Sequence, residues 1–166
     1  MKRIAISLLA FSSAGLIGLA VHEDYARMPY QDSVGKWTDG YGNTVNVVPG
    51  KPVPHARALI TLAKNVDAHA TEIKRCFGDV PLYQHEFDAF VDLAFNVGAP
   101  TVCRSSIPQK LRACNYAAAC ASILSFDKIT VNGEKVSCKD PANNCRGIVK
   151  RRQETYNRCM GATDRA

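Results

Sequence analysis

The sequence lacks several features that would each define a class of protein. It has no C-x-x-C pair, and none of its four histidines stands at a zinc-site spacing from a cysteine, which argues against a structural zinc site. It has no Gly/Ser-rich, Pro-rich or repetitive tract, so neither a linker nor a repeat array is indicated. No fingerprint of a nucleic-acid-binding module is present either. The 166 residues therefore predict one domain behind an N-terminal appendage, without a metal or another cofactor.

The chain is basic and rich in cysteine. A net charge of +6 at pH 7 predicts a polyanionic partner, and the missing modules disfavour nucleic acid relative to anionic lipid or a cell-wall polymer. The seven cysteines fit disulfides in an oxidising compartment such as the periplasm, with at least one cysteine left unpaired. The sequence does not give the pairing, although Cys138 and Cys145 are a candidate short-loop pair.

An uncharged apolar segment spans residues 4–21, directly after Lys2 and Arg3. As a helix it would be about 27 Å long, close to the roughly 30 Å of a hydrocarbon core, and the two cations favour a cytoplasmic N-terminus. Half of its residues are Ala, Gly or Ser, so its hold on a bilayer would be weak. A cleavable signal peptide and a permanent anchor are both open interpretations.

The rest of the chain predicts an α+β protein that is mostly helical. Residues 27–48 are glycine-punctuated and rich in Tyr, Trp, Thr and Val, which predicts a small antiparallel sheet with a tight turn at Gly35-Lys36. Apolar residues at helical spacing predict helices over residues 55–75, 83–97, 105–112, 115–125 and 146–159.

Three polar residues bracket the predicted sheet. Glu23, Asp32 and Thr38 follow the spacing E-x8-D-x5-T, and the stretches FVDLAFNVG (residues 90–98) and GIVKRRQETYNRC (147–159) come later in the chain. Together they resemble the phage lysozyme family, the muramidases that include the lysozyme of the T-even phages. The resemblance implies a lysozyme-like two-lobed fold, with a long linking helix and a helical C-terminal lobe. It also implies hydrolysis of the β-1,4 bond between N-acetylmuramic acid and N-acetylglucosamine in peptidoglycan.

The chemistry of glycoside cleavage explains these residue types. A glycosidic oxygen leaves only when a carboxylic acid protonates it, while a second carboxylate stays ionised to activate water. We assign Glu23 as the general acid, Asp32 as the ionised partner and Thr38 as the hydroxyl that holds the attacking water. The resemblance implies inversion of configuration. The structural alternatives are that Glu23 is a solvated residue at a helix end, that Asp32 is a turn residue and that Thr38 is an ordinary strand residue.

Four further residues are candidates for substrate binding. The resemblance places Gly42 where sugar approaches the backbone and places the amide of Asn96 toward the sugar, although Asn96 also suits a helix end. Arg151 and Arg152 either steer the acidic glycan, brace Glu23, or form a solvated basic helix face.

Two acidic residues depart from the family pattern. Asp24 stands where many relatives carry glycine, and Asp39 stands where an apolar residue is usual. Carboxylates close to the catalytic pair raise carboxyl pKa values, so both residues are expected to affect the pH optimum.

The resemblance also bears on export. The family pattern puts Glu23 at the end of an N-terminal helix, which here is the apolar segment itself. This is similar to the signal-anchor-release endolysins, in which a weak, uncleaved anchor holds the enzyme inactive on the inner membrane until it is released to the periplasm. We therefore expect an anchor over residues 1–21, a catalytic domain over residues 22–166, and a monomer that lyses the host cell. Rival interpretations are a non-catalytic peptidoglycan-binding module, a membrane-anchored structural protein and a lytic transglycosylase.

Overall fold

The computed structural model describes residues 2–32, 35–131 and 133–162. The helices are α1 (Ser13–Glu23), α2 (His55–Phe77), α3 (Gln84–Val97), α4 (Ala99–Cys103), α5 (Ile107–Arg112), α6 (Tyr116–Ala121) and α7 (Arg146–Cys159), with 3-10 turns η1 (Ile6–Leu8), η2 (Ser122–Ser125) and η3 (Pro141–Asn143). The strands form antiparallel pairs: β1 (Ile4–Ala5) with β4 (Pro81–Leu82), β2 (Ala26–Gln31) with β3 (Trp37–Gly40), and β5 (Lys128–Val131) with β6 (Glu134–Ser137).

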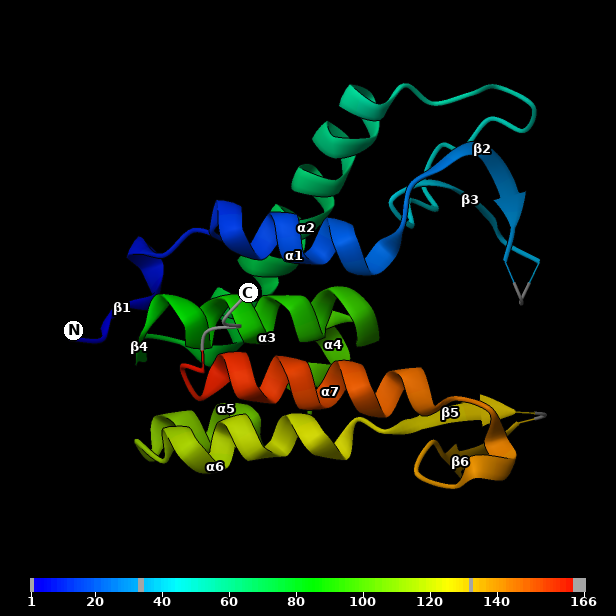
Figure 1. The fold of residues 1–166 in the computed structure, drawn as a ribbon. Helices are drawn as coiled ribbons and strands as arrows, with labels where there is room; N and C mark the ends of the chain where they lie inside the picture. Colours follow the sequence, from blue (N-terminus) through cyan, green and yellow to red (C-terminus); the bar gives the residue numbers. More distant parts are fainter. Residues whose placement is uncertain (1, 33–34, 132, 163–166) are drawn as a thin grey trace.

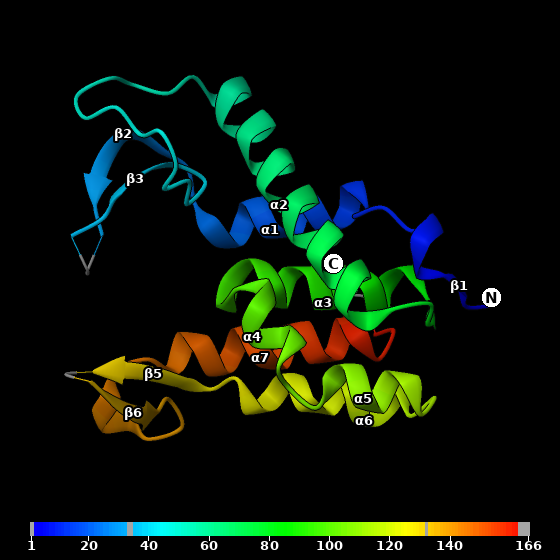
Figure 2. The ribbon, with the colours of Figure 1, turned by 180° about the vertical axis from the view of Figure 1, so that it is seen from behind.

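These elements form two lobes joined by one long helix (Figure 1). The β2–β3 hairpin and the loop after it make the smaller lobe, and α2 runs from that loop into the helical lobe. There α3 and α7 lie side by side, with α5 and α6 beyond α7 and α4 on the face seen in Figure 2. The predicted lysozyme-like, mostly helical α+β fold is confirmed, including its linking helix.

The core is centred on α3, which packs against both α2 and α7. Its aromatic residues Phe87 and Phe90 are fully buried, and the Phe90 ring meets Phe77 of α2 edge to face with centroids 5.4 Å apart. Burial of one such side chain contributes about 2–3 kcal/mol. The helical lobe therefore gives the rest of the chain a rigid support.

Most of the predicted elements are present, with a few differences. The helix predicted over residues 55–75 continues to Phe77. It is capped by Gly78, whose φ of +74° is a conformation that glycine adopts more easily than other residues. The helix predicted over residues 83–97 ends at Val97 as expected, and Pro100 follows in the first turn of the short helix α4, where its missing N–H leaves no helical hydrogen bond unmade. The β5–β6 hairpin was not predicted from the sequence. Part of the turn predicted near Gly35 lies outside the described residues.

The apolar N-terminal segment does not form one continuous helix. It begins as β1 and η1, and α1 starts only after Ser12, whose Oγ accepts the Gly15 N–H at 3.0 Å as an N-cap. Ile6, Leu9 and Leu19 from this segment are buried in the core of the helical lobe. Among the described residues, no helix is both long enough and apolar enough to span a membrane.

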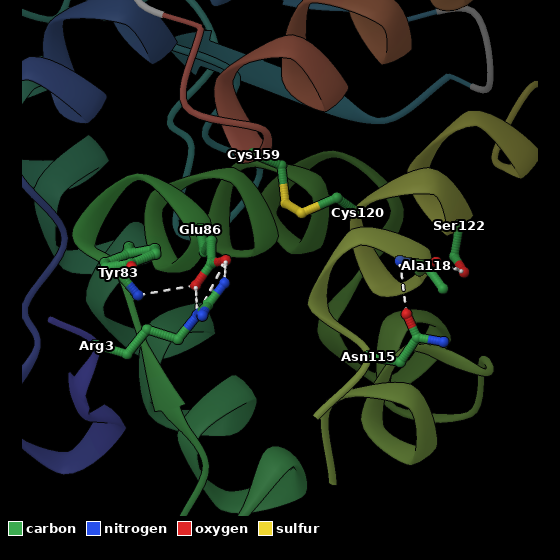
Figure 3. The surroundings of a disulfide bond; sticks show 8 residues. All are labelled: Arg3, Tyr83, Glu86, Asn115, Ala118, Cys120, Ser122 and Cys159. Atoms are coloured by element: carbon green, nitrogen blue, oxygen red, sulfur yellow. Dashed lines mark hydrogen bonds and ion pairs between the residues drawn. A yellow bond between two sulfur atoms is a disulfide. The ribbon is translucent and has the colours of Figure 1, made fainter. Parts of the chain in front are cut away.

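Polar contacts also hold this segment against α3. The Arg3 guanidinium donates to both Glu86 carboxylate oxygens (Figure 3). It also lies over the rings of Tyr83 and Tyr116, with its central carbon 4.3 and 3.6 Å from their centroids. Ser12 donates its hydroxyl and its backbone N–H to the Asp88 carboxylate at 2.6 and 3.0 Å. Charge-assisted hydrogen bonds of this kind are stronger than neutral ones, so α1 has a fixed position on the lobe.

Three disulfides join segments of the helical lobe. They link Cys76 to Cys103, Cys120 to Cys159, and Cys138 to Cys145, while Cys114 carries an exposed free thiol. The short-loop pair expected from the sequence is confirmed. The Cys120–Cys159 bond, shown in Figure 3, ties α6 to the end of α7.

We expect the Cys120→Ala/Cys159→Ala double variant to lose about 3–4 kcal/mol of unfolding free energy. The two cysteines are 39 residues apart in the sequence, so loss of the disulfide raises the conformational entropy of the unfolded chain. Urea denaturation under oxidising conditions measures the change. Cys114→Ser is the matched control and should unfold at the wild-type midpoint; equal midpoints for all three proteins would contradict the prediction.

Candidate active site

The proposed acid, Glu23, is the last residue of α1 and is held by α7. Its Oε1 lies 2.7 Å from Arg151 Nη2, and both side chains are largely buried. The same Arg151 nitrogen lies 3.3 Å from Asp92 Oδ1 on α3. Arg151 therefore shares its charge between two carboxylates and fixes the end of α1 relative to α3 and α7. Among the alternatives for Arg151, its ion pair with Glu23 corresponds to bracing of that residue. The neighbouring Lys150 is instead the solvent-exposed cation of α7.

Asp92 is a residue of this network that the sequence analysis did not single out. Its side chain is only 1% exposed, and it accepts hydrogen bonds from Thr155 Oγ1 at 3.1 Å and from Arg158 at 3.3 Å. A buried carboxylate is tolerated only when cations and donors surround it. The signal was present in the sequence, because Asp92 is an acid on the buried side of the stretch FVDLAFNVG.

Asp32 and Thr38 both belong to the β2–β3 hairpin and both contact Lys36. Asp32 Oδ1 accepts the Lys36 N–H at 2.8 Å, and the two residues also share a backbone hydrogen bond of 2.9 Å. Thr38 is buried opposite Tyr30, and its hydroxyl donates to the Lys36 carbonyl at 3.3 Å. The hairpin thus fixes the two side chains relative to each other, and Asp32 also closes its turn.

Gly42 lies so close to the Glu23 carboxylate that a side chain there would make a tight contact with it. A Cβ on Gly42 would lie 3.2 Å from Glu23 Oε2, and its φ of +72° also favours glycine. The loop that carries it is closed by Asp39 and Asn43, which exchange two backbone hydrogen bonds of 2.9 Å. The Asp39 carboxylate accepts the Asn43 side-chain amide at 2.7 Å, which satisfies this unusual buried acid.

Asn96 and Arg152 form a separate group. Arg152 donates to Asn96 Oδ1 and, through Nε, to the Phe126 carbonyl at 2.9 Å. The pKa of Arg152 is lowered to about 10, mainly by burial and also by the nearby charge of Arg151, while Asp92 partly opposes both effects. Both residues line a hollow of about 810 Å³ on the helical lobe. The four candidate substrate-binding residues therefore divide into Gly42 and Arg151 beside Glu23, and Asn96 and Arg152 in this hollow.

Asp24 has a backbone conformation that suits glycine, which explains why many relatives carry glycine at this position. It directly follows α1, with φ +50° and ψ 153°, a combination that L-residues other than glycine rarely adopt. The turn from α1 into β2 needs this conformation, since Glu23 must stay on α7 while Ala26 begins the hairpin. Asp24 is therefore a strained position beside the proposed acid.

Comparison with known proteins gives this geometry its family context. The sequence profile of the phage lysozyme family matches residues 20–155. The chain belongs to the phage lysozyme family. Membership makes peptidoglycan its substrate and glycoside hydrolysis its class of reaction.

Individual relatives agree with this assignment. An endolysin of Acyrthosiphon pisum secondary endosymbiont phage 1 is 31% identical over 142 residues, which cover 86% of this chain and 92% of the relative. A protein named SAR-endolysin from Haemophilus phage HP1 is 27% identical over 150 residues, covering 84% and 75% of the two chains.

Solved structures show the same fold. The endolysin of Escherichia coli O157:H7 phage FAHEc1 matches with a TM-score of 0.83 at 24% identity, covering 94% of this chain and 96% of the other. The P1 phage endolysin Lyz matches with a TM-score of 0.71 in its active form and 0.54 in its secreted inactive form. The active form is 23% identical, and the match covers 100% of this chain and 99% of the other. The inactive form is 21% identical, and the match covers 95% of this chain and 100% of the other. The present arrangement is thus closer to the active form.

Replacing Asp24 with glycine should raise the free energy of unfolding by about 1 kcal/mol, because glycine adopts positive φ without strain. Urea denaturation measures the difference. Asp79→Gly is the matched control at an exposed position without positive φ, and it should be neutral or slightly destabilising. A destabilised Asp24→Gly variant would show that the aspartate side chain, rather than its backbone, governs this turn.

Proposed function

We propose that the chain hydrolyses the β-1,4 bond between N-acetylmuramic acid and N-acetylglucosamine, with Glu23 as general acid. The observation that carries the proposal is the position of Glu23. Its carboxylate ends α1, pairs through one oxygen with Arg151 at 2.7 Å, and has the backbone of Gly42 beside its other oxygen. The hairpin with Asp32 and Thr38 begins three residues later, at Ala26.

The residues then divide the reaction between them. Glu23 donates its proton to the glycosidic oxygen as the bond to C1 of the muramic acid breaks. Asp32 accepts a proton from the water that attacks C1, and Thr38 orients this water through its hydroxyl. Attack from the face opposite the leaving group inverts the configuration. Gly42 leaves room for the sugar beside Glu23, and Asn96 and Arg152 contact the substrate in the hollow of the helical lobe.

Glu23→Gln tests the acid. We expect a loss of at least three orders of magnitude in the release of reducing ends from purified walls, because the amide keeps the shape of the carboxyl but has no acidic proton. Glu154→Gln is the control. Glu154 lies on α7 with its carboxylate 3.7 Å from His22 of α1, and among the described residues it forms no ion pair or hydrogen bond with Glu23. It should retain activity within about twofold.

The products separate the rival interpretations. A folded Glu23→Gln variant with wild-type activity would move the acid to another residue. Wild-type protein that binds walls tightly but releases no fragments would be a non-catalytic binding module. Anhydro-muramic ends without new reducing ends would identify a lytic transglycosylase, which needs no water.

We also propose that residues 1–21 act as a weak membrane anchor, released to the periplasm before the monomeric enzyme lyses the host. Support comes from apolar residues that the folded lobe leaves exposed: Leu8, Ile17 and Val21 are 76%, 66% and 73% exposed, while Leu19 is buried. Such a surface suits a segment that occupies lipid before it folds. The relative from phage HP1 is named as a SAR-endolysin, which agrees with this proposal.

Release and catalysis are linked through α1. Glu23 reaches Arg151 only when α1 lies on the helical lobe, with Ser12 bonded to Asp88 and Leu19 buried. While residues 4–21 stay in a bilayer, Glu23 is at the membrane surface and this network is open. Folding of the segment therefore assembles the proposed acid.

A Ser7→Leu/Ser13→Leu variant tests the anchor, because both serines are exposed in the folded lobe and leucine favours membrane insertion. After an uncoupler collapses the membrane potential, uncleaved wild-type chain should appear in the periplasmic fraction, while the variant stays with the membrane. The purified variant should still degrade walls at about the wild-type rate. Release of a shortened chain would instead identify a cleaved signal peptide, and retention of the wild type would identify a permanent anchor.

A further inference from the structure

Three rings meet where the smaller lobe joins the linking helix. They belong to Tyr25, which lies between α1 and β2, to Tyr41 in the loop after β3, and to His55, the first residue of α2. The His55 imidazole stacks on Tyr25 with centroids 4.6 Å apart and planes inclined by 13°, and its Nε2 lies 2.6 Å from the Tyr41 hydroxyl. The two tyrosine rings lie 5.7 Å from each other. One imidazole therefore joins two segments that are separated in the sequence.

The contact with Tyr25 acts on the chain that leaves the proposed acid. Tyr25 is two residues beyond Glu23, and its hydroxyl donates to the Val53 carbonyl just before α2. Between them lies Asp24, whose strained backbone persists only where its neighbours are held firmly. On the Glu23 side this support is the ion pair with α7. On the Tyr25 side it is the stacked imidazole of His55 together with the hydrogen bond to Val53.

The contact with Tyr41 acts on the loop beside the Glu23 carboxylate. Tyr41 is 7% exposed and directly precedes Gly42, where a Cβ would lie 3.2 Å from Glu23 Oε2. On the other side of Tyr41, a Cβ on Gly40 would lie 3.0 Å from the Ala58 Cβ of α2. The loop is therefore held against the start of α2 by close packing at Gly40 and by the hydrogen bond to the imidazole.

The His55 side chain is exposed, so its replacement opens no cavity in the core. Its two contacts need different parts of the ring, because stacking uses the planar face and the bond to Tyr41 uses Nε2. Phenylalanine supplies the face without the nitrogen. A single substitution therefore removes the hydrogen bond and leaves the stacking in place.

We propose that His55 is a positioning residue for the proposed acid. By stacking on Tyr25 and bonding to Tyr41, it keeps the chain after Glu23 and the loop at Gly42 in place around one carboxylate. The inference rests on the proposed function for the role of Glu23. Since a misplacement of about 1 Å can slow a reaction by roughly two orders of magnitude, loosening either segment lowers kcat.

The test uses Tyr41→Phe, His55→Phe and the double variant, which remove the same hydrogen bond from either end and keep the rings. We expect each to lower kcat for the release of reducing ends from walls about tenfold. KM should change less than twofold, because Tyr41 is buried and neither side chain is assigned a contact with the sugar. The double variant should lose no more than either single one. His55→Gln, whose amide can bond to Tyr41, should retain most of kcat.

His85→Phe is the matched control, because His85 also stacks on a tyrosine, Tyr83, with centroids 5.3 Å apart, but lies at the start of α3 in the helical lobe. It should keep kcat within twofold of wild type. A tenfold loss in this control, wild-type kcat in either single variant, or losses that multiply in the double variant would overturn the inference.

Amide hydrogen exchange separates this inference from the proposed function. The Asp39 and Asn43 N–H groups bond across the loop at 2.9 Å, and both should exchange about tenfold faster in Tyr41→Phe and His55→Phe than in wild type. Unchanged exchange would overturn the positioning role at any level of activity. A wild-type chain that cleaves no walls would remove the proposed function, while faster exchange in the variants would still show that His55 holds the loop.

Discussion

The ion pair between Glu23 and Arg151 joins the N-terminal helix α1 to the helical lobe, and the position of the proposed acid depends on it. Arg151 is shared with Asp92, so one guanidinium joins α1, α3 and α7 at the point where the chain turns toward the smaller lobe. Asp92 in turn accepts from Thr155 and Arg158, which completes its surroundings inside the helical lobe. Breaking a buried set of this kind costs about 3–5 kcal/mol, so the carboxylate of Glu23 is fixed by the same forces that stabilise the fold.

That constraint gives the N-terminal segment two physical tasks. Its residues Ile6, Leu9 and Leu19 fill the core, and the helix that it forms, α1, ends at the proposed acid. A segment with only one environment would bury its apolar face and expose polar residues, yet Ile17 and Val21 face solvent here. The mixture agrees with the membrane anchor proposed above, because lipid accepts apolar residues on every side of a helix and a globular lobe accepts them on one.

Consecutive residues of α7 lie in two different surroundings. Arg151 pairs with Glu23, while Arg152 lines the hollow of the helical lobe. The β5–β6 hairpin, which also lines this hollow, is joined to the start of α7 by the Cys138–Cys145 disulfide.

Periodicity and spacing are local properties, so the sequence alone predicts the main helices, the early hairpin, the family and the order of Glu23, Asp32 and Thr38. The pairing of the cysteines, the sharing of Arg151 with Asp92 and the positive φ of Asp24 emerge only once the chain is folded. The tertiary structure also separated Arg151 from Arg152, which the sequence treated as one basic pair. Consecutive residues of a helix point about 100° apart, and the partner that each one meets depends on which elements pack around the helix, information that no local pattern contains.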